Sequence, residues 1–375
     1  MKWLSILFLA SLLLGQVGGI SLTPGVVVYV HDVFLAVLLA DVLLHFRYRK
    51  FRNLQMTNAV LFFVGAAVVS LLFNVNALGW PTVGVASLYL IRWVFYAAVV
   101  FVVVQKFLPP VRWLYGLFAV GVGFGVLGLF QFFLYPDLRN LMYLGWDPHY
   151  YRLFSTLLDP NFAGILFVLT CLLGLALWEN KKVRIWICLG EVVSAIGLLL
   201  TYSRSSYLAA AAAIVTLAIL QKQWKILLAI LILGLLVVFI PRTQGSTLSL
   251  LRADSTFARV GSWEQGVALI SAAPLFGHGF DTLRYLTPAS PASKSAAGLD
   301  SSILFVGATT GVVGMLAYGY LIFSMIKTGR KNIVYLASLA AIGVHSLFVN
   351  SAFYPWVMIW MWVLTGVLLK ISGDK

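Results

Sequence analysis

The chain has 375 residues, of which 61% are hydrophobic and 10% are charged, and its mean hydropathy is +0.97. Soluble domains contain roughly half apolar and roughly a quarter charged residues, so this composition excludes a soluble globule and indicates a polytopic membrane protein. The formal net charge of +14 could suggest nucleic-acid binding. Basic loops beside membrane helices more often report orientation, because Lys and Arg are retained on the cytoplasmic side.

A helix of roughly 20 apolar residues can cross about 30 Å of hydrocarbon while satisfying its own backbone hydrogen bonds. The sequence predicts an all-α fold with about twelve such helices in a single membrane domain, residues 1–375. The runs lie near residues 3–20, 25–44, 57–77, 83–105, 113–135, 157–178, 183–202, 205–221, 224–240, 301–325, 332–350 and 353–370. The first run could be a cleaved signal peptide, but its small-residue site is poorly defined, so we favour a retained helix.

Arg92 in the fourth run is the outstanding charge within the apolar runs, and Asp32 in the second run lies at comparable depth from the outer side. A charge within a membrane should be paired, so we predict a contact between them. The cysteines, Cys171 and Cys188, also fall in apolar runs. The pattern indicates buried thiols and shows neither a disulfide framework nor a set of metal ligands.

Basic residues alternate between successive loops, which predicts cytoplasmic termini and an outward position for every other loop. The inner loops and the C-terminus hold Arg47, Arg49, Lys50, Arg52, Lys106, Arg112, Lys181, Lys182, Arg184, Lys222, Lys225, Lys327, Arg330, Lys331, Lys370 and Lys375. The outer basic residues are Arg139, Arg152, Arg204, Arg242, Arg252, Arg259, Arg284 and Lys294. The planar fork of Arg suits bidentate contacts with phosphate or carboxylate, so this outer set binds either an anionic ligand or lipid headgroups.

The first outer excursion, residues 136–156, is aromatic. Its rings fit either the headgroup interface or stacking against sugars. It leads into a motif that runs from Arg152 to Asn161, in which Asp159 is a good N-cap and Pro160 a good first helical residue. Capping does not explain Arg152.

The turn Tyr202-Ser-Arg204-Ser-Ser-Tyr207 places an Arg among hydroxyl groups at the start of the eighth helix. A helix N-terminus favours an anion there. Snorkelling of Arg204 to the membrane surface is the alternative.

The longest water-compatible stretch is a large outer loop, residues 241–300. Within it, apolar residues recur at spacings of three and four over 255–273, which predicts an amphipathic helix on the outer leaflet, ended by Pro274, with Arg259 facing away from lipid. Residues 287–298 are small and turn-rich, typical of a flexible gate. Asp300 and Ser301 then open the tenth helix, where Asp300 could be a cap and Gly311 and Gly314 could serve close packing.

Four motifs follow one another along the chain: residues 152–161, the turn at 203–205, residues 259–263 with 274–279, and Asp300-Ser301 with its spaced glycines. Together with residues 345–354 they resemble the O-antigen ligase and polymerase family over about residues 150–365. The resemblance implies a GT-C-like membrane glycosyltransferase that moves a glycan from an undecaprenyl diphosphate carrier to a lipid or glycan acceptor on the outer face. It also implies that no nucleotide sugar, metal or other cofactor takes part.

The resemblance implies that Arg204 and Arg259 contact the diphosphate. It suggests substrate-binding roles for Arg152, Asp159, Asn161, Ser205, Trp263, His278 and His345. The sequence departs from the ligases at Asp300, because they have His in that slot. An ionised Asp could still accept a hydroxyl proton, and His278 or His345 could supply an imidazole or be structural. Because of this departure, the sequence does not decide between ligase and polymerase activity.

Two other classes of function remain possible on the sequence alone. A transporter or flippase would be expected to show repeated halves and ionisable residues at the membrane midplane, and no such symmetry is visible. A noncatalytic assembly protein could retain the same scaffold.

Overall fold

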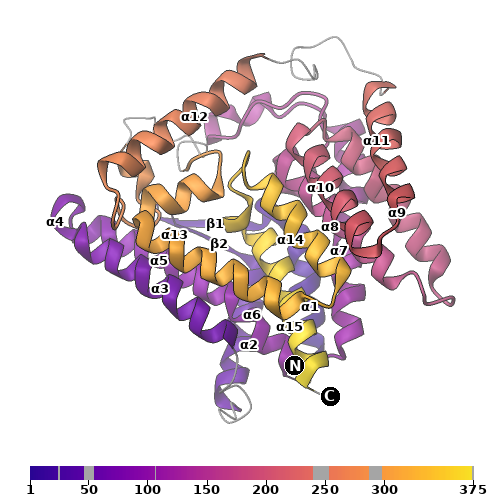
Figure 1. Ribbon diagram of the computed structural model, residues 1–375, viewed down its shortest axis with the longest axis horizontal. Coiled ribbons are helices and arrows are strands. Elements are labelled where there is room, and N and C mark those ends of the chain that lie inside the picture. Colours follow the sequence, from indigo (N-terminus) through magenta and orange to yellow (C-terminus); the bar gives the residue numbers. More distant parts are fainter. Residues whose placement is uncertain (24–25, 46–54, 106, 240–252, 287–297, 374–375) are drawn as a thin grey trace.

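A computed structural model describes residues 1–23, 26–45, 55–105, 107–239, 253–286 and 298–373. Within these ranges one short hairpin is the only sheet, and the remaining regular elements are helical (Figure 1). The elements of the N-terminal part are α1 (Lys2–Ser11), η1 (Leu12–Gly18), β1 (Gly19–Thr23), β2 (Val26–Tyr29), α2 (Val30–Leu44), α3 (Gln55–Phe73), α4 (Val75–Leu78), α5 (Trp80–Ala97), α6 (Val99–Val104) and α7 (Pro110–Leu134).

The elements of the remaining part are η3 (Arg139–Leu144), η4 (Ser155–Leu157), α8 (Pro160–Leu177), α9 (Arg184–Leu200), α10 (Arg204–Gln221), η5 (Trp224–Leu227), α11 (Leu228–Phe239), α12 (Ala253–Ala272), η7 (Leu283–Tyr285), α13 (Ser302–Gly329), α14 (Ile333–His345), η9 (Ser351–Phe353) and α15 (Pro355–Gly373). The all-α class predicted from the sequence is confirmed.

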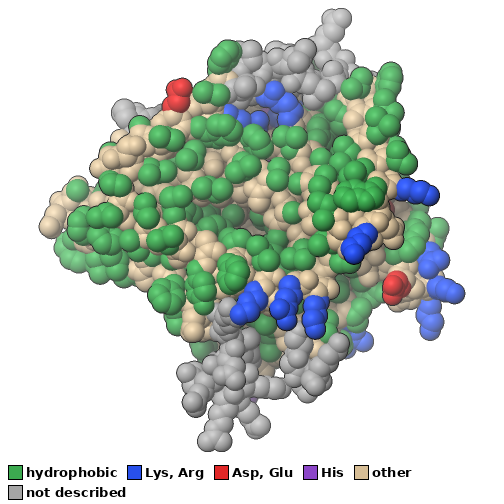
Figure 2. Space-filling view, in the orientation of Figure 1, with side chains coloured by type: hydrophobic (Ala, Val, Ile, Leu, Met, Phe, Trp, Pro, Cys, Tyr) green, Lys and Arg blue, Asp and Glu red, His purple; other side chains and the backbone are tan. Residues whose placement is uncertain are grey.

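Six helices in the described ranges are long and apolar enough to cross a membrane. They are Met56–Phe73, Trp80–Val104, Pro110–Leu134, Pro160–Leu177, Arg204–Gln221 and Ser302–Gly329. Each of the other predicted runs also contains a helix, but it is shorter or less apolar, so twelve spans remain a prediction. Hydrophobic side chains form a broad band across the face in Figure 2, and Lys and Arg gather along its lower edge. The N- and C-termini lie near that edge (Figure 1).

The sequence predicted helices over residues 3–20 and 25–44, and this prediction is wrong where the two segments meet. The first helical segment breaks at Gly15, which has φ +54°, and a Cβ there would lie 2.3 Å from the carbonyl oxygen of Thr156. The chain then forms the antiparallel hairpin β1–β2, in which Gly19 pairs with Tyr29. Residues 26–29 are β-branched and aromatic, which favours a strand. The hairpin brings Tyr29 beside the start of α2.

Helix α13 is broken at Gly311, where φ is +65°. The segment 274–279 fills the break: His278 N donates to Ala308 O at 2.9 Å, and Val312 N donates to Pro274 O at 2.8 Å. A membrane helix tolerates such a break where neighbours satisfy its backbone groups. Gly311 therefore allows the backbone of segment 274–279 to hydrogen-bond with the backbone of α13. It also allows the two segments to pack closely.

Gly311→Ala is expected to lower stability. Its Cβ would lie 2.3 Å from Leu275 O, and an L residue is strained at this φ; overpacking alone typically costs about 1–3 kcal/mol. Gly319→Ala, in the same helix, meets nothing within 4 Å and should be tolerated, because Ala favours helix over Gly. Thermal unfolding of both variants in detergent checks this. Equal melting temperatures would contradict the role given to Gly311.

The amphipathic helix predicted over 255–273 is confirmed as α12, which lies along the upper edge in Figure 1. Phe257 and Val267 on its apolar stripe are 72% and 56% exposed. Arg259, Ser262 and Gly266 are more enclosed, so they face the protein. Residues 241–252 and the predicted gate at 287–297 lie outside the described residues.

Candidate active site

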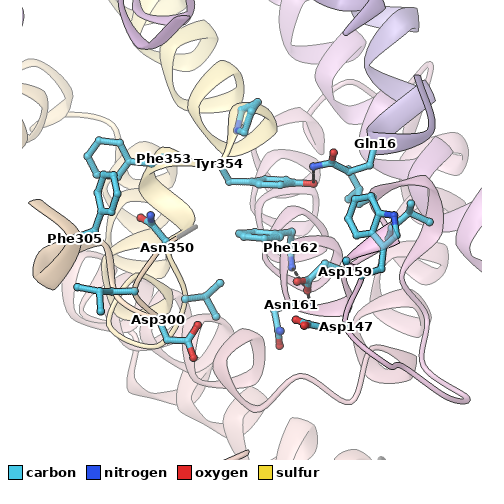
Figure 3. A pocket seen from close by; sticks show the side chains of 18 of the residues that line it. Gln16, Asp147, Asp159, Asn161, Phe162, Asp300, Phe305, Asn350, Phe353 and Tyr354 are labelled. Atoms are coloured by element: carbon cyan, nitrogen blue, oxygen red, sulfur yellow. Dashed lines mark hydrogen bonds between the residues drawn. The ribbon is translucent and has the colours of Figure 1, made fainter. Parts of the chain in front are cut away.

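One cavity of about 1020 Å³ is lined by the hairpin, α5, the excursion before α8, the starts of α8 and α10, and α12. The segments that precede α13 and α15 complete its walls. Figure 3 shows Asp300 and Asn350 on one side of the cavity and Asp147, Asp159 and Asn161 on the other. Predicted site residues that line it are Arg152, Asp159, Asn161, Arg204, Arg259 and Asp300. The fold thus gathers residues that are far apart in the sequence.

Arg204 is the first residue of α10. Ser203 caps this helix by accepting from Ser206 N at 3.4 Å, and its hydroxyl donates to Asn161 Oδ1 at 2.8 Å. The turn is thereby tied to the start of α8. Arg204 lines the cavity beside the helix N-terminus, where backbone N–H groups and the helix dipole add to the positive potential.

Arg259 enters the same cavity from α12. Burial lowers the pKa of Arg259 below its ordinary value, and the positive charge of Arg204 lowers it further, while Asp300 and Asp159 oppose the shift. The two arginines therefore repel each other across one cavity. A bound dianion would relieve that repulsion and accept from both guanidinium groups.

Asp300 is not the helix cap. Ser301 caps α13, with its hydroxyl accepting from Leu304 N at 3.5 Å, so the capping interpretation of Asp300 is wrong. The backbone N–H of Asp300 donates to Ser262 Oγ on α12 at 3.0 Å, which holds Asp300 near Arg259. Burial raises the pKa of the Asp300 carboxyl, Arg259 opposes this, and Asp147 adds to it. The carboxyl is left available for chemistry in the cavity.

Arg152 has a positioning role. It is buried, with 4% exposure, and its Nε donates to Thr201 O at 2.8 Å while Nη2 lies 3.4 Å from Tyr202 O. These carbonyls end α9 and precede Arg204. Arg152 therefore neutralises the C-terminus of α9 and fixes the turn that carries Arg204.

Asp159 caps α8 as predicted, and accepts from Asn161 N at 2.6 Å. Asp147, His149 and Asp159 also place one possible metal-ligand atom each within 4.8 Å of one another. Nothing in the sequence pattern indicated this group, since Asp159 joins the other two only through folding. Arg152 Nη1 lies 3.4 Å from His149 Nδ1, so a metal ion here would face a guanidinium charge. Metal independence stays a prediction.

The pH dependence of stability tests the environment of Asp159. Burial raises its pKa to about 6, with Asp147 adding to the shift. A folded-state pKa above the unfolded value of 3.8 means that the folded state holds a proton the unfolded state has lost. Stability should therefore fall as the pH rises from about 4 to about 6. Asp159→Asn keeps a capping side chain and should flatten this slope in thermal unfolding, whereas an unchanged slope would contradict the assignment.

Four other predicted residues do not line the cavity. His345 is fully buried between helices, where Nε2 lies 3.2 Å from the hydroxyls of Ser205 and Ser206. His278 Nε2 lies 3.0 Å from Leu269 O at the end of α12. Neither histidine supplies an imidazole to the cavity in this structure. Trp263 packs against Phe348 at 5.8 Å between ring centroids, and Ser205 is held in the His345 network.

The predicted contact between Arg92 and Asp32 is confirmed at 3.4 Å. Sequence reasoning missed that Arg92 lines the cavity together with Asp281 and Arg284. The sequence did contain a signal for this group, because Arg284 is one of the arginines predicted to lie on the outer side. The position of Asp281, three residues before Arg284, was a second signal.

The arrangement defines a helical membrane protein with a cavity lined by arginines and carboxyls. Residues 189–319 match the family model described as O-antigen ligase, a stretch that contains Arg204, Arg259 and Asp300. No curated protein matches the chain. The match supports, for that stretch, the resemblance to O-antigen ligases and polymerases, and with it an enzyme of glycan assembly in a bacterial membrane.

Proposed function

We propose that this protein transfers a glycan from an undecaprenyl-diphosphate-linked donor to a lipid or glycan acceptor. The observation that carries the proposal is the meeting of Arg204, Arg259 and Asp300 at one cavity. The two arginines approach from different helices and affect one another electrostatically. A diphosphate offers oxygens on two phosphorus atoms, which suits two converging guanidinium groups.

The proposed reaction is a single displacement. The acceptor hydroxyl oxygen forms a bond to the anomeric carbon of the donor, and the bond from that carbon to the diphosphate oxygen breaks. The leaving oxygen takes the electron pair and is stabilised by Arg204 and Arg259. Asp300 accepts the hydroxyl proton as general base. The step needs no oxidant or metal, and transfer in excess chelator would test the second point.

The proposal places the cavity on the extracytoplasmic face of the inner membrane, with both termini in the cytoplasm. The alternation of basic loops supports this orientation. A transporter would use the same apolar helices but would not require a carboxyl base beside the arginines. Transfer assays on the purified protein therefore separate the two functions directly.

Reporter fusions test the orientation. Fusions after Arg52, Arg184 and Lys331 are expected to report cytoplasm, because these residues lie in the basic loops predicted to be retained inside. Fusions near Gly245 and Ser290, which lie outside the described residues, are expected to report the exterior. A cytoplasmic signal at Gly245 would place the cavity on the wrong side for a lipid-linked donor and would overturn the proposed function.

A further inference from the structure

A second charged group is built from Asp32, Arg92, Asp281 and Arg284, of which Arg92, Asp281 and Arg284 line the cavity. The charges that act on Asp281 are those of Arg284 and Arg92, whereas Asp300 is affected by Arg259 and Asp147. Arg284 Nη2 lies 3.6 Å from Asp281 Oδ2, and Arg92 Nη2 lies 3.4 Å from Asp32 Oδ2. Each cation in this second group therefore has its own carboxyl.

Aromatic rings and an amide complete the second group. Arg284 Nη1 donates to the Tyr89 hydroxyl at 3.2 Å, and its guanidinium carbon lies 4.7 Å from the Tyr89 ring centroid. Tyr29 donates to Gln16 Oε1 at 2.6 Å. Gln16 Nε2 donates to the Tyr354 hydroxyl at 3.4 Å, a contact drawn in Figure 3. Tyrosine rings, their hydroxyls and the Gln16 amide therefore line the cavity together with Arg92, Asp281 and Arg284.

Asp281 has an unusual backbone conformation, and its pair with Arg284 is incompletely hydrogen-bonded. Asp281 has φ +57°, a left-handed conformation that is unusual outside Gly. Its Oδ2 and the Nε of Arg284 are buried atoms that make no hydrogen bond within the described structure. Such atoms call for an explanation, and strained residues cluster at ligand sites.

We propose that this second group binds an uncharged, hydroxyl-rich sugar, the acceptor end of the transfer reaction. A hydroxyl both donates and accepts, so it can bridge a neighbouring carboxyl and guanidinium such as those of Asp281 and Arg284. Because the charges within the group are paired, it offers less attraction to a phosphate than the arginine pair near Asp300. The inference rests on the proposed function, and divides the cavity into a diphosphate subsite and a sugar subsite.

The test compares two ligands on purified full-length protein. Inorganic diphosphate represents the donor headgroup, and a panel of neutral disaccharides represents the acceptor, with binding followed by saturation-transfer NMR. Asp281→Asn combined with Arg284→Gln is expected to weaken binding of the panel sugars roughly tenfold or more, because charged hydrogen bonds are lost. Diphosphate binding should persist in that variant and be lost in Arg204→Ala.

A matched control is available on the exposed pair Asp137 and Arg139, which are 2.7 Å apart and outside the cavity. Asp137→Asn with Arg139→Gln should leave both ligands unaffected. Tyr89→Phe removes one hydroxyl while keeping the ring, and should weaken sugar binding even if the double variant folds poorly.

The inference is overturned if no panel sugar binds the wild-type protein, or if sugar binding survives in both the double variant and Tyr89→Phe. If diphosphate nevertheless binds to the wild-type protein and not to Arg204→Ala, the proposed function stands and only the sugar subsite is rejected. Failure of diphosphate to bind at all would count against the proposed function itself, whatever the sugars do.

Discussion

Asp300→Asn is expected to abolish or nearly abolish glycan transfer without reducing the amount of folded protein. The variant retains a side chain of the same shape, but cannot accept the hydroxyl proton. Loss of a general base typically lowers the rate by about 10²- to 10⁴-fold. Because Ser301 and not Asp300 caps α13, the substitution should leave the helix start intact.

Two measurements accompany that variant. Glu264→Gln makes the same acid-to-amide change on the exposed face of α12, outside the cavity, and should retain wild-type transfer. The pKa of Asp300 is raised by burial, so wild-type transfer should fall as acidification protonates the carboxylate. Wild-type rates in purified Asp300→Asn protein would remove Asp300 from the mechanism. Neither His278 nor His345 lines the cavity to replace it.

The second large expected effect is a loss of transfer rate in Arg204→Ala and in Arg259→Ala. In the proposed reaction each variant lacks one donor to the departing diphosphate, and loss of one such donor commonly costs about 10²- to 10³-fold in rate. Arg→Lys at either position should restore little activity, because a point charge replaces the bidentate fork. Transfer rates at saturating donor, with protein amounts matched by immunoblotting, give the comparison.

Arg139→Ala is the matched control, since Arg139 is exposed and paired with Asp137 outside the cavity. It is expected to behave as wild type. If both Arg204→Ala and Arg259→Ala retained near-normal transfer, the diphosphate would have to bind elsewhere. If Arg139→Ala lost activity as well, general charge on the outer surface would explain the effect better than a defined site.

Local sequence signals predicted the helical parts of this protein well. Asp159 followed by Pro160 marked the start of α8, and the spacing of apolar residues marked α12. Both signals act within one or two helical turns, which is the range over which capping and amphipathicity operate. The pairing of Arg92 with Asp32 was predictable because an unpaired charge in a membrane is costly.

Features that depend on distant parts of the chain were not predictable. The break at Gly311 requires the partner segment 274–279, and the capping choice between Asp300 and Ser301 depends on the backbone around them. His345 seemed a candidate for chemistry, but lies in a buried hydroxyl network. Spacing along the chain contains no information on which side of a helix meets the cavity when its neighbours are unknown.

The most direct test is transfer by the purified protein in liposomes, supplied with an undecaprenyl-diphosphate-linked glycan and a candidate acceptor. We expect covalent joining of glycan to acceptor, with undecaprenyl diphosphate released in equal amount, and with both products absent in Asp300→Asn. Movement of the intact lipid-linked glycan across the bilayer without release of undecaprenyl diphosphate would contradict a transferase and indicate a transporter.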